Sequence, residues 1–148
     1  MTWIDKYLTR ETMYSWHVAF RGGGFSNDPD MKLFFRQGVQ YRAPSFLATS
    51  FNDKTAMGFM LRANYETDTE PIMWYVHYSL EFCTHAHFLQ KSNIEAESEF
   101  LFTTFSVFTV LSVEWQERPK ITNPHVIHLM ASVDNADEED WLPLAPWT

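Results

Sequence analysis

The sequence has a single cysteine, no long hydrophobic run and few basic side chains. Because Cys83 is alone, neither an intrachain disulfide nor a four-thiolate metal site can form, which favours a reducing compartment. No apolar run approaches the roughly 20 residues of a transmembrane helix. Residues 1–8, with Asp5 and Lys6, lack the apolar stretch of a signal peptide. We therefore expect a soluble, cytoplasmic protein, an effector delivered to the cytoplasm, or one domain of a longer chain.

Acidic side chains outnumber basic ones by 19 to 11, which gives a formal net charge of -8. This charge repels a phosphate backbone, so nucleic acid is an unfavourable partner, and we expect no membrane partner. Apolar side chains are abundant, with 45% hydrophobic and 17% aromatic residues. That is enough apolar area to bury a core. For 148 residues we expect one domain that spans 1–148.

The N-terminal half combines helical periodicity with short apolar runs. Residues 3–16 have the spacing of a short helix. The apolar run 18–20 predicts a strand that ends at Arg21 and three glycines. The further elements expected are a short helix after the turn at 27–30 that stops at Gly38, a strand over 39–51 broken by Pro44, and a helix that begins at Asn52 or Asp53 and continues through Ala63.

The C-terminal half is almost wholly strand-like after a polar loop at 64–70. Helices early and strands late predict an α+β fold. The apolar segment 141–147 is expected to pack back on the domain. The strands expected are 72–82, 85–89, 99–102, 106–115 and 125–133.

Three separated pieces of sequence stand out together, in a fixed order. They resemble the signature of ADP-ribosyltransferases of the arginine-serine-glutamate class, over residues 18–110. The resemblance implies two packed, mainly antiparallel sheets around an NAD cleft, with short helices in the N-terminal half. The three pieces are Phe20-Arg21-Gly22, Phe46-Leu47-Ala48-Thr49-Ser50 and Glu97-Ser98-Glu99-Phe100-Leu101-Phe102.

The resemblance also implies roles for individual residues. Arg21 would anchor the NAD phosphates, and the backbone of Gly22 would hold the nicotinamide amide. Glu99 would contact the ribose and stabilise the developing cation, while Glu97 would handle the acceptor. The further positions that match cofactor-binding positions of the family are Phe46, Thr49, Ser50 and Phe59.

The implied activity is that of a glycosyltransferase-type enzyme, an NAD-dependent mono-ADP-ribosyltransferase that releases nicotinamide. NAD would be a substrate, no metal would take part, and the acceptor would be a protein arginine. Loss of nicotinamide leaves positive charge on the ribose, which a fixed carboxylate stabilises. Residues two apart on a strand point the same way, so Glu97 and Glu99 can line one cleft.

One departure leaves other functions open, because Ala48 stands where the family has its first serine. Ser50 presents a hydroxyl on the same side of the expected strand, two positions further along. NAD hydrolysis, in which water replaces the acceptor, needs only Arg21 and Glu99. A binding module that has lost turnover is the other alternative, and Ala48 favours it.

Each residue also has a plain structural interpretation. Taken singly, Arg21 is typical of a surface arginine before a loop, and Glu97 and Glu99 of a solvated strand edge. Cys83 is typical of a small core residue. The histidines His85, His87, His125 and His128 lack a neighbour that completes a tetrahedral metal site, so packed or surface imidazoles are expected.

Overall fold

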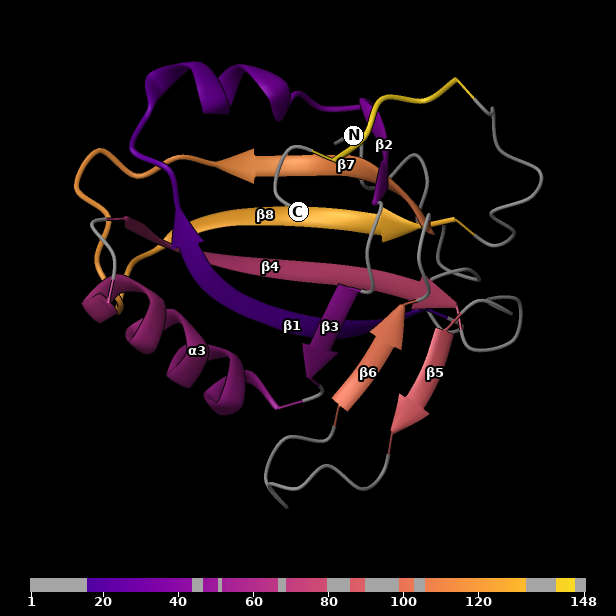
Figure 1. The fold of residues 1–148 in the computed structure, drawn as a ribbon, viewed down its shortest axis with the longest axis horizontal. Coiled ribbons are helices and arrows are strands. Elements are labelled where there is room, and N and C mark those ends of the chain that lie inside the picture. Colours follow the sequence, from indigo (N-terminus) through magenta and orange to yellow (C-terminus); the bar gives the residue numbers. More distant parts are fainter. Residues whose placement is uncertain are drawn as a thin grey trace.

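The computed structural model describes residues 16–43, 47–50, 52–66, 69–79, 86–89, 99–102, 106–132 and 141–145. Most of these residues lie in strands, and two helical segments accompany them (Figure 1). The elements are β1 (Trp16–Phe25), η1 (Pro29–Phe34), β2 (Gln40–Ala43), β3 (Leu47–Ser50), α3 (Asp53–Glu66), β4 (Glu70–Ser79), β5 (Ala86–Leu89), β6 (Glu99–Phe102), β7 (Ser106–Glu114) and β8 (His125–Ala131).

The first strand is longer than the sequence predicts. We expected a strand that ends at Arg21, but β1 continues through all three glycines to Phe25. The reason is its neighbour, because β4 pairs with β1 along the full length from Trp16 to Phe25. Tertiary pairing therefore outweighs the weak strand propensity of glycine. The helix expected over 3–16 lies outside the described residues, except for Trp16 itself.

The predicted start of the long helix is confirmed. Asn52 precedes α3, and its side-chain oxygen accepts a hydrogen bond from the backbone N–H of Lys54 at 2.9 Å. The Asn52 carbonyl accepts the first helical bond, from the N–H of Ala56 at 3.2 Å. This is the geometry of an N-cap. The prediction of a loop from residue 64 is wrong, because α3 continues to Glu66.

The short helix η1 also begins where the sequence indicates. Asp28 caps it, since its carboxylate accepts a hydrogen bond from the backbone N–H of Asp30 at 3.0 Å. Pro29 occupies the first turn, where a missing N–H has no cost. The segment is a 3-10 helix that ends at Phe34, so the expected end at Gly38 is wrong.

The strands form one hydrogen-bonded sheet, not the two packed sheets that we expected. Its eight strands follow the order β2-β7-β8-β4-β1-β3-β6-β5. All pairs are antiparallel except β4 with β8, which are parallel, so the sheet is mixed. The expectation failed because Phe20 of β1 pairs with Ser50 of β3, and this pair joins the two groups of strands into one sheet. The sequence alone does not indicate this pairing.

The sheet nevertheless has two unlike parts. The five-strand part consists of β2, β7, β8, β4 and β1, and the three-strand part consists of β3, β6 and β5. Figure 1 shows β3, β6 and β5 running steeply across the direction of β7, β8 and β4. The residues 39–51, predicted as one strand, supply β2 at one edge of the sheet and β3 beyond β1.

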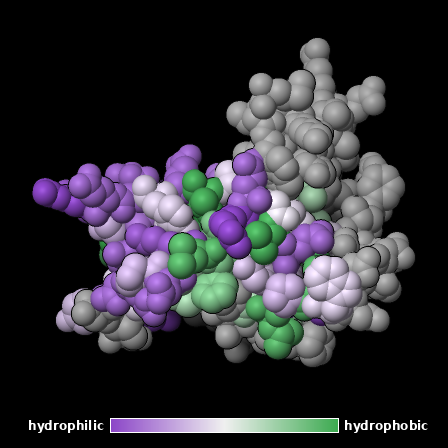
Figure 2. Space-filling view, turned by 90° about the horizontal axis from the view of Figure 1, so that it is seen from above, coloured by the Kyte–Doolittle hydropathy of each residue, from purple (hydrophilic) through white to green (hydrophobic). Residues whose placement is uncertain are grey.

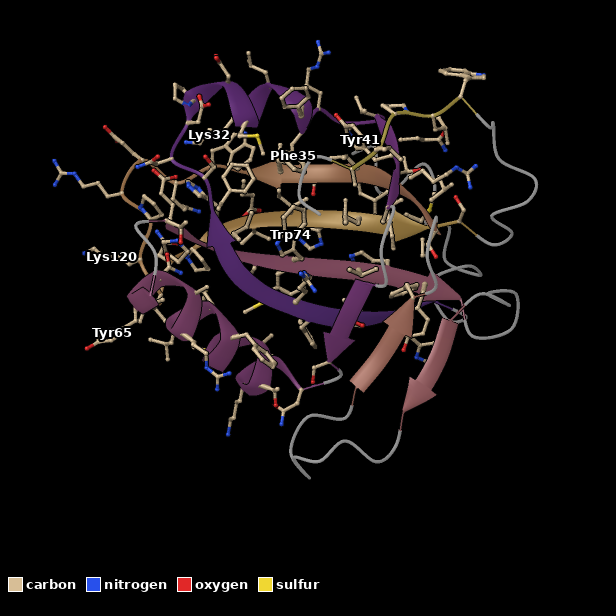
Figure 3. The ribbon with its side chains drawn as sticks, in the orientation of Figure 1. Lys32, Phe35, Tyr41, Tyr65, Trp74 and Lys120 are labelled. Carbon is tan, nitrogen blue, oxygen red and sulfur yellow. The ribbon has the colours of Figure 1, made fainter. Side chains whose placement is uncertain are left out.

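The main core lies on one face of the five-strand part and is rich in aromatic residues. Phe35, at the end of η1, packs edge to face on Trp74 of β4 with ring centroids 5.5 Å apart (Figure 3). Phe102 of β6 reaches the same core and contacts Phe108 of β7 at 5.3 Å. The main core comprises Ala19, Phe25, Phe35, Tyr41, Ala43, Ile72, Trp74, Val76, Tyr78, Phe102, Phe108, Val110, Ile127, Leu129, Ala131 and Ala145.

The C-terminal segment packs back on the sheet, as predicted. The backbone N–H of Ala145 donates to the carbonyl of Arg42 at 2.9 Å, and the N–H of Arg42 donates to the carbonyl of Pro143 at 3.0 Å. Ala145 is buried in the main core, whereas Trp141 is exposed. Within the described residues 141–145, the contact with β2 involves 143–145.

The surface on the η1 side carries hydrophobic groups that hydrophilic ones interrupt (Figure 2). Leu33 and Phe34 of η1 and Leu144 near the C-terminus are exposed apolar residues. Neither described helix is long and apolar enough to cross a membrane.

Candidate functional site

Arg21 lies in the middle of β1, on the face that carries the main core. Its partner across the β1–β4 ladder is Trp74, which is buried. Burial lowers the pKa of the Arg21 guanidinium, because a partly dehydrated cation is less stable than a hydrated one. Arginine still keeps its charge at neutral pH. A half-buried cation of this kind is suited to bind an anion such as a phosphate.

Gly22 faces the other way and lies directly under α3. A Cβ atom at Gly22 would be 1.7 Å from the carbonyl oxygen of Ala56 and 3.1 Å from the Cβ of Met60. Only glycine therefore allows α3 to pack this closely on β1. Gly23 differs, since a Cβ there would have nothing within 4 Å. Alternation along the strand places Gly23 on the same face as Arg21.

Among the described residues, β1 has no strand partner on its β3 side beyond Phe20. The β4 side is paired from end to end, whereas the β3 side pairs only through Phe20 and Ser50. Alternate residues of a strand direct their N–H and C=O groups toward the same edge. Between 21 and 25, the β3-side edge thus has no strand partner among the described residues. An amide-bearing ligand can pair with such an edge as an added strand does.

A row of paired residues brings the three sequence motifs together. Phe20 of β1 pairs with Ser50 of β3, and Ser50 pairs in turn with Glu99 of β6. Ala48 pairs with Leu101, two residues further along β6. The glutamate and serine motifs are thus direct neighbours in the sheet. No local pattern in the sequence indicates that Ser50, rather than Ala48, lies opposite Glu99.

The residues at the end of β3 are buried and held in place. Ser50 is only 5% exposed, and Thr49 beside it is equally enclosed. The Ser50 hydroxyl accepts a hydrogen bond from the backbone N–H of Asn52 at 3.0 Å. This bond links the end of β3 to the residue that caps α3. The short segment 50–52 therefore connects the strand that pairs with Glu99 to the helix that packs against Gly22.

The structure does not bring every predicted site residue to this row. Phe59 lies on α3 and is 42% exposed, and its ring is 5.6 Å from the guanidinium carbon of Arg62. The helix turns Ala56 and Met60 toward β1 instead. Phe46 and Glu97 lie outside the described residues. Glu99 is placed by its backbone position in β6.

Arg21 and Phe20, the β1 residue of the row, point to opposite faces of the sheet. Phe20 packs in a smaller cluster with α3, whereas Arg21, one residue later, faces the main core. The three-strand part is turned relative to the five-strand part at this point (Figure 1). The candidate site therefore lies where the two parts of the sheet join, around Phe20 and Ser50.

Two histidines form a pair that the sequence did not predict. The Nε2 atom of His77 lies 3.0 Å from Nδ1 of His128, and the His128 ring stacks on Tyr75 with centroids 4.7 Å apart. Burial, and then the proximity of His128, lower the pKa of His77 to about 4. Burial also lowers the pKa of His128, against the opposing effect of Glu114. Both imidazoles are therefore neutral at pH 7.

His125 is packed in the interior, as expected of a structural histidine. Its Nδ1 accepts a hydrogen bond from the N–H of Gln116 at 2.9 Å, so its proton is on Nε2. That nitrogen lies 2.5 Å from the carboxylate of Glu70, which is 3.9 Å from the ammonium of Lys32. The contacts tie η1 to the first residues of β4 and β8. His85 and Cys83 lie outside the described residues.

Among the residues that the structure describes, no three metal-ligating side chains are grouped to hold an ion. No family model matches the chain, and no curated protein matches it. Solved structures do match.

Several of the matching structures are ADP-ribosyltransferases. Vis toxin, an ADP-ribosyltransferase from Vibrio splendidus, superposes with a TM-score of 0.61 at 16% identity, over 83% of this chain and 51% of that one. A second Vis structure, in complex with agmatine, gives 0.60 at 15% identity, over 90% and 59%. The Clostridium limosum C3 exoenzyme gives 0.58 at 15% identity, over 85% and 66%.

Exoenzyme S from Pseudomonas aeruginosa, in complex with human 14-3-3 protein beta and bound to carba-NAD, gives a TM-score of 0.54 at 16% identity. The alignment covers 94% of this chain and 63% of that one. The chain thus spans about half to two thirds of the length of these structures. The ADP-ribosyltransferase-like fold expected from the three motifs is confirmed.

Proposed function

We propose that this protein is an NAD-dependent mono-ADP-ribosyltransferase that transfers ADP-ribose to an arginine of a protein acceptor and releases nicotinamide. The observation that carries the proposal is the row Phe20–Ser50–Glu99, which joins the three motifs within a matching fold. A fold alone does not define a function, because one fold hosts many activities. The coincidence of fold, motif order and register supports this activity.

We assign NAD binding to two residues of the β1 motif, Arg21 and Gly22, which would contact different parts of NAD. Arg21 is the half-buried cation, and it would pair with the diphosphate. Gly22 lies on the strand whose β3-side edge is open after Phe20, and its backbone would pair with the nicotinamide amide. The further residues that we assign to the cofactor are Phe46, Thr49, Ser50 and Phe59.

Glu99 is assigned to the chemical step. Cleavage of the bond between nicotinamide and ribose leaves positive charge on the sugar. A carboxylate fixed in the sheet stabilises that charge more in the transition state than in the ground state, which is what accelerates a reaction. The paired position of Glu99 in β6 provides such a fixed location.

Glu97 is assigned to the acceptor. In the transfer, a guanidinium nitrogen forms a bond to the ribose carbon that nicotinamide leaves, and the nitrogen loses a proton. We assign that proton to Glu97. The Vis structure with agmatine, which has the guanidinium group of arginine, supports an acceptor of this chemistry.

Two other functions use the same residues. In NAD hydrolysis, water replaces the guanidinium, and only Arg21 and Glu99 are needed. A binding module without turnover is favoured by one feature, Ala48 in place of the serine that the resemblance implies. Both alternatives are outcomes of the same experiment.

The test is to incubate the protein with NAD, with and without agmatine, and to measure free nicotinamide and ADP-ribosylagmatine. Our proposal predicts both products, with more nicotinamide when agmatine is present. Nicotinamide without ADP-ribosylagmatine would identify a hydrolase, and NAD binding without nicotinamide would identify a binding module. Absence of NAD binding in calorimetry would contradict all three assignments.

Glu97→Gln separates the two carboxylates. We expect this variant to keep NAD cleavage and to lose roughly 100-fold in transfer to agmatine, because the general base is gone while Glu99 remains. The ratio of ADP-ribosylagmatine to free nicotinamide measures the effect. Equal loss of both activities would show that the glutamates act as one unit.

A further inference from the structure

The three glycines of β1 have unlike surroundings on the two faces of the sheet. A Cβ atom at Gly22 would collide with the carbonyl of Ala56, and a Cβ atom at Gly24 would be 2.0 Å from Oγ1 of Thr69. Side chains alternate along a strand, so Gly22 and Gly24 belong to one face. The helix α3 and Thr69 cover that face. The other face, to which Gly23 belongs, is the side from which a ligand can approach the glycines.

The face that Gly23 shares with Arg21 has a gap between buried residues. Ala19 and Phe25, on the same face of β1, are 0% and 3% exposed. Arg21 and Gly23 lie between them, and both are partly exposed. A Cβ atom at Gly23 would meet no described atom within 4 Å. Solvent therefore reaches the position beside Arg21, whereas the positions before and after these two residues are filled.

The backbone at Gly23 is held in place from α3. Its carbonyl accepts a hydrogen bond from Nδ2 of Asn64 at 3.4 Å, and the same nitrogen donates to the carbonyl of Met60 at 2.7 Å. A glycine inside a strand often marks a place where a ligand or another part of the chain approaches the backbone closely. The other two glycines have such a neighbour in the protein, whereas the described residues supply none for Gly23.

We propose that Gly23 is a specificity-determining residue for NAD, because its missing side chain admits the diphosphate beside Arg21. This inference rests on the proposed function. It assigns two groups of NAD to different sides of β1: the nicotinamide amide pairs with the backbone edge at Gly22, and the diphosphate lies over the face that Arg21 and Gly23 share. Same-face neighbours on a strand are roughly 7 Å apart, so a group bound by the long side chain of Arg21 can lie over Gly23.

The experiment measures the dissociation constants of NAD, ADP-ribose and nicotinamide by calorimetry for Gly23→Ala and Gly23→Leu. ADP-ribose carries the diphosphate but lacks nicotinamide. We expect the affinity for NAD and for ADP-ribose to fall with side-chain size, by several-fold for Gly23→Ala and roughly 100-fold for Gly23→Leu. The affinity for nicotinamide should stay within about twofold of the wild type, because the backbone edge at Gly22 is unchanged.

The matched control is Gly58→Leu. A Cβ atom at Gly58 also meets no described atom within 4 Å, but this glycine lies in α3. The control should bind all three ligands like the wild type. Thermal unfolding of each variant separates a loss of affinity from a loss of folding. If Gly23→Leu does not fold, Gly23→Ala decides the question, and its affinity for ADP-ribose must still fall several-fold.

The outcomes distinguish this inference from the proposed function. If the wild type binds and cleaves NAD while folded Gly23→Leu binds ADP-ribose with unchanged affinity, the role of Gly23 is overturned and the proposed function stands. A loss of nicotinamide affinity with unchanged ADP-ribose affinity would place the nicotinamide over Gly23, which also overturns the inference. A wild type that binds no NAD overturns the proposed function and this inference together.

Discussion

The five-strand part and the three-strand part of the sheet differ in how firmly they are built. β1 and β4 contain 10 residues each and are paired throughout, and their aromatic side chains enter the main core. β3, β5 and β6 contain four residues each, and among the described residues a single pair connects them to β1. The five-strand part is a scaffold, and the described strand pairing joins the three-strand part to it at one place, beside the packing of Phe102 in the main core.

The proposed chemistry needs both parts. Arg21 and Gly22 belong to the five-strand part, whereas Ser50 and Glu99 belong to the three-strand part. The relative position of cation and carboxylate therefore depends on the join at Phe20 and Ser50. Substitutions in the two parts should separate stability from activity.

The largest effect is expected at Gly22. Gly22→Ala places a methyl group 1.7 Å from the Ala56 carbonyl oxygen, so α3 must move or the protein fails to fold. We expect a loss of roughly 4 kcal/mol or more in the free energy of unfolding, measured by urea denaturation. Gly23→Ala is the matched control, because its Cβ meets no atom within 4 Å. That control should change stability by less than about 1 kcal/mol. Equal effects of the two changes would show that α3 does not rest on Gly22.

Among the described side chains of the three-strand part, Phe102 packs in the main core. Phe102→Ala removes contacts with Phe108 and Tyr78 and should cost roughly 3 kcal/mol. Amide hydrogen exchange should accelerate most in β3 and β6, while β4 and β8 keep their protection. Phe35→Ala, equally buried but under η1, should leave β3 and β6 comparatively protected. Uniform acceleration in both variants would contradict the division into two parts.

A smaller, pH-dependent effect is expected from His77 in the five-strand part. Its pKa is about 4 when folded, against the ordinary 6.5, and its ring stacks on His128, which in turn stacks on Tyr75. Between these pH values the unfolded chain binds more protons, so the free energy of unfolding falls as the pH is lowered from 6.5 toward 4. The loss should be roughly 2 kcal/mol, discounted for partial exposure.

His77→Gln removes the titrating group while it keeps a neutral side chain beside His128. Urea denaturation between pH 4 and 7 should show a flatter profile for this variant than for the wild type. An unchanged slope would show that another group controls stability in this range.

Several elements were predictable from sequence because local signals and tertiary pairing agree. The strand β6 matches the predicted 99–102, and β7 differs from its prediction by one residue. Asn52 and Asp28 cap the helices that their sequence positions indicate. The ADP-ribosyltransferase-like fold was inferred from the order of the three motifs, and it is found although four of the matching structures are only 15–16% identical.

The features that were not predictable depend on contacts between distant residues. By propensity, the three glycines should end the strand, yet pairing with β4 extends β1 through them. One of them, Gly22, is also required for the close packing of α3. The pairing of Ser50 with Glu99 depends on a register that no local pattern encodes. The same holds for the contact between His77 and His128, which are far apart in the chain.

The central claim is that Glu99, held in β6 opposite Ser50, cleaves NAD, and Glu99→Gln tests it most directly. The measurement is nicotinamide release at saturating NAD, with NAD affinity from calorimetry and Glu114→Gln, an exposed carboxylate of β7, as the control. We predict that Glu99→Gln binds NAD like the wild type and releases nicotinamide roughly 100-fold more slowly or less, while Glu114→Gln stays active. Nicotinamide release by Glu99→Gln at the wild-type rate would contradict the claim.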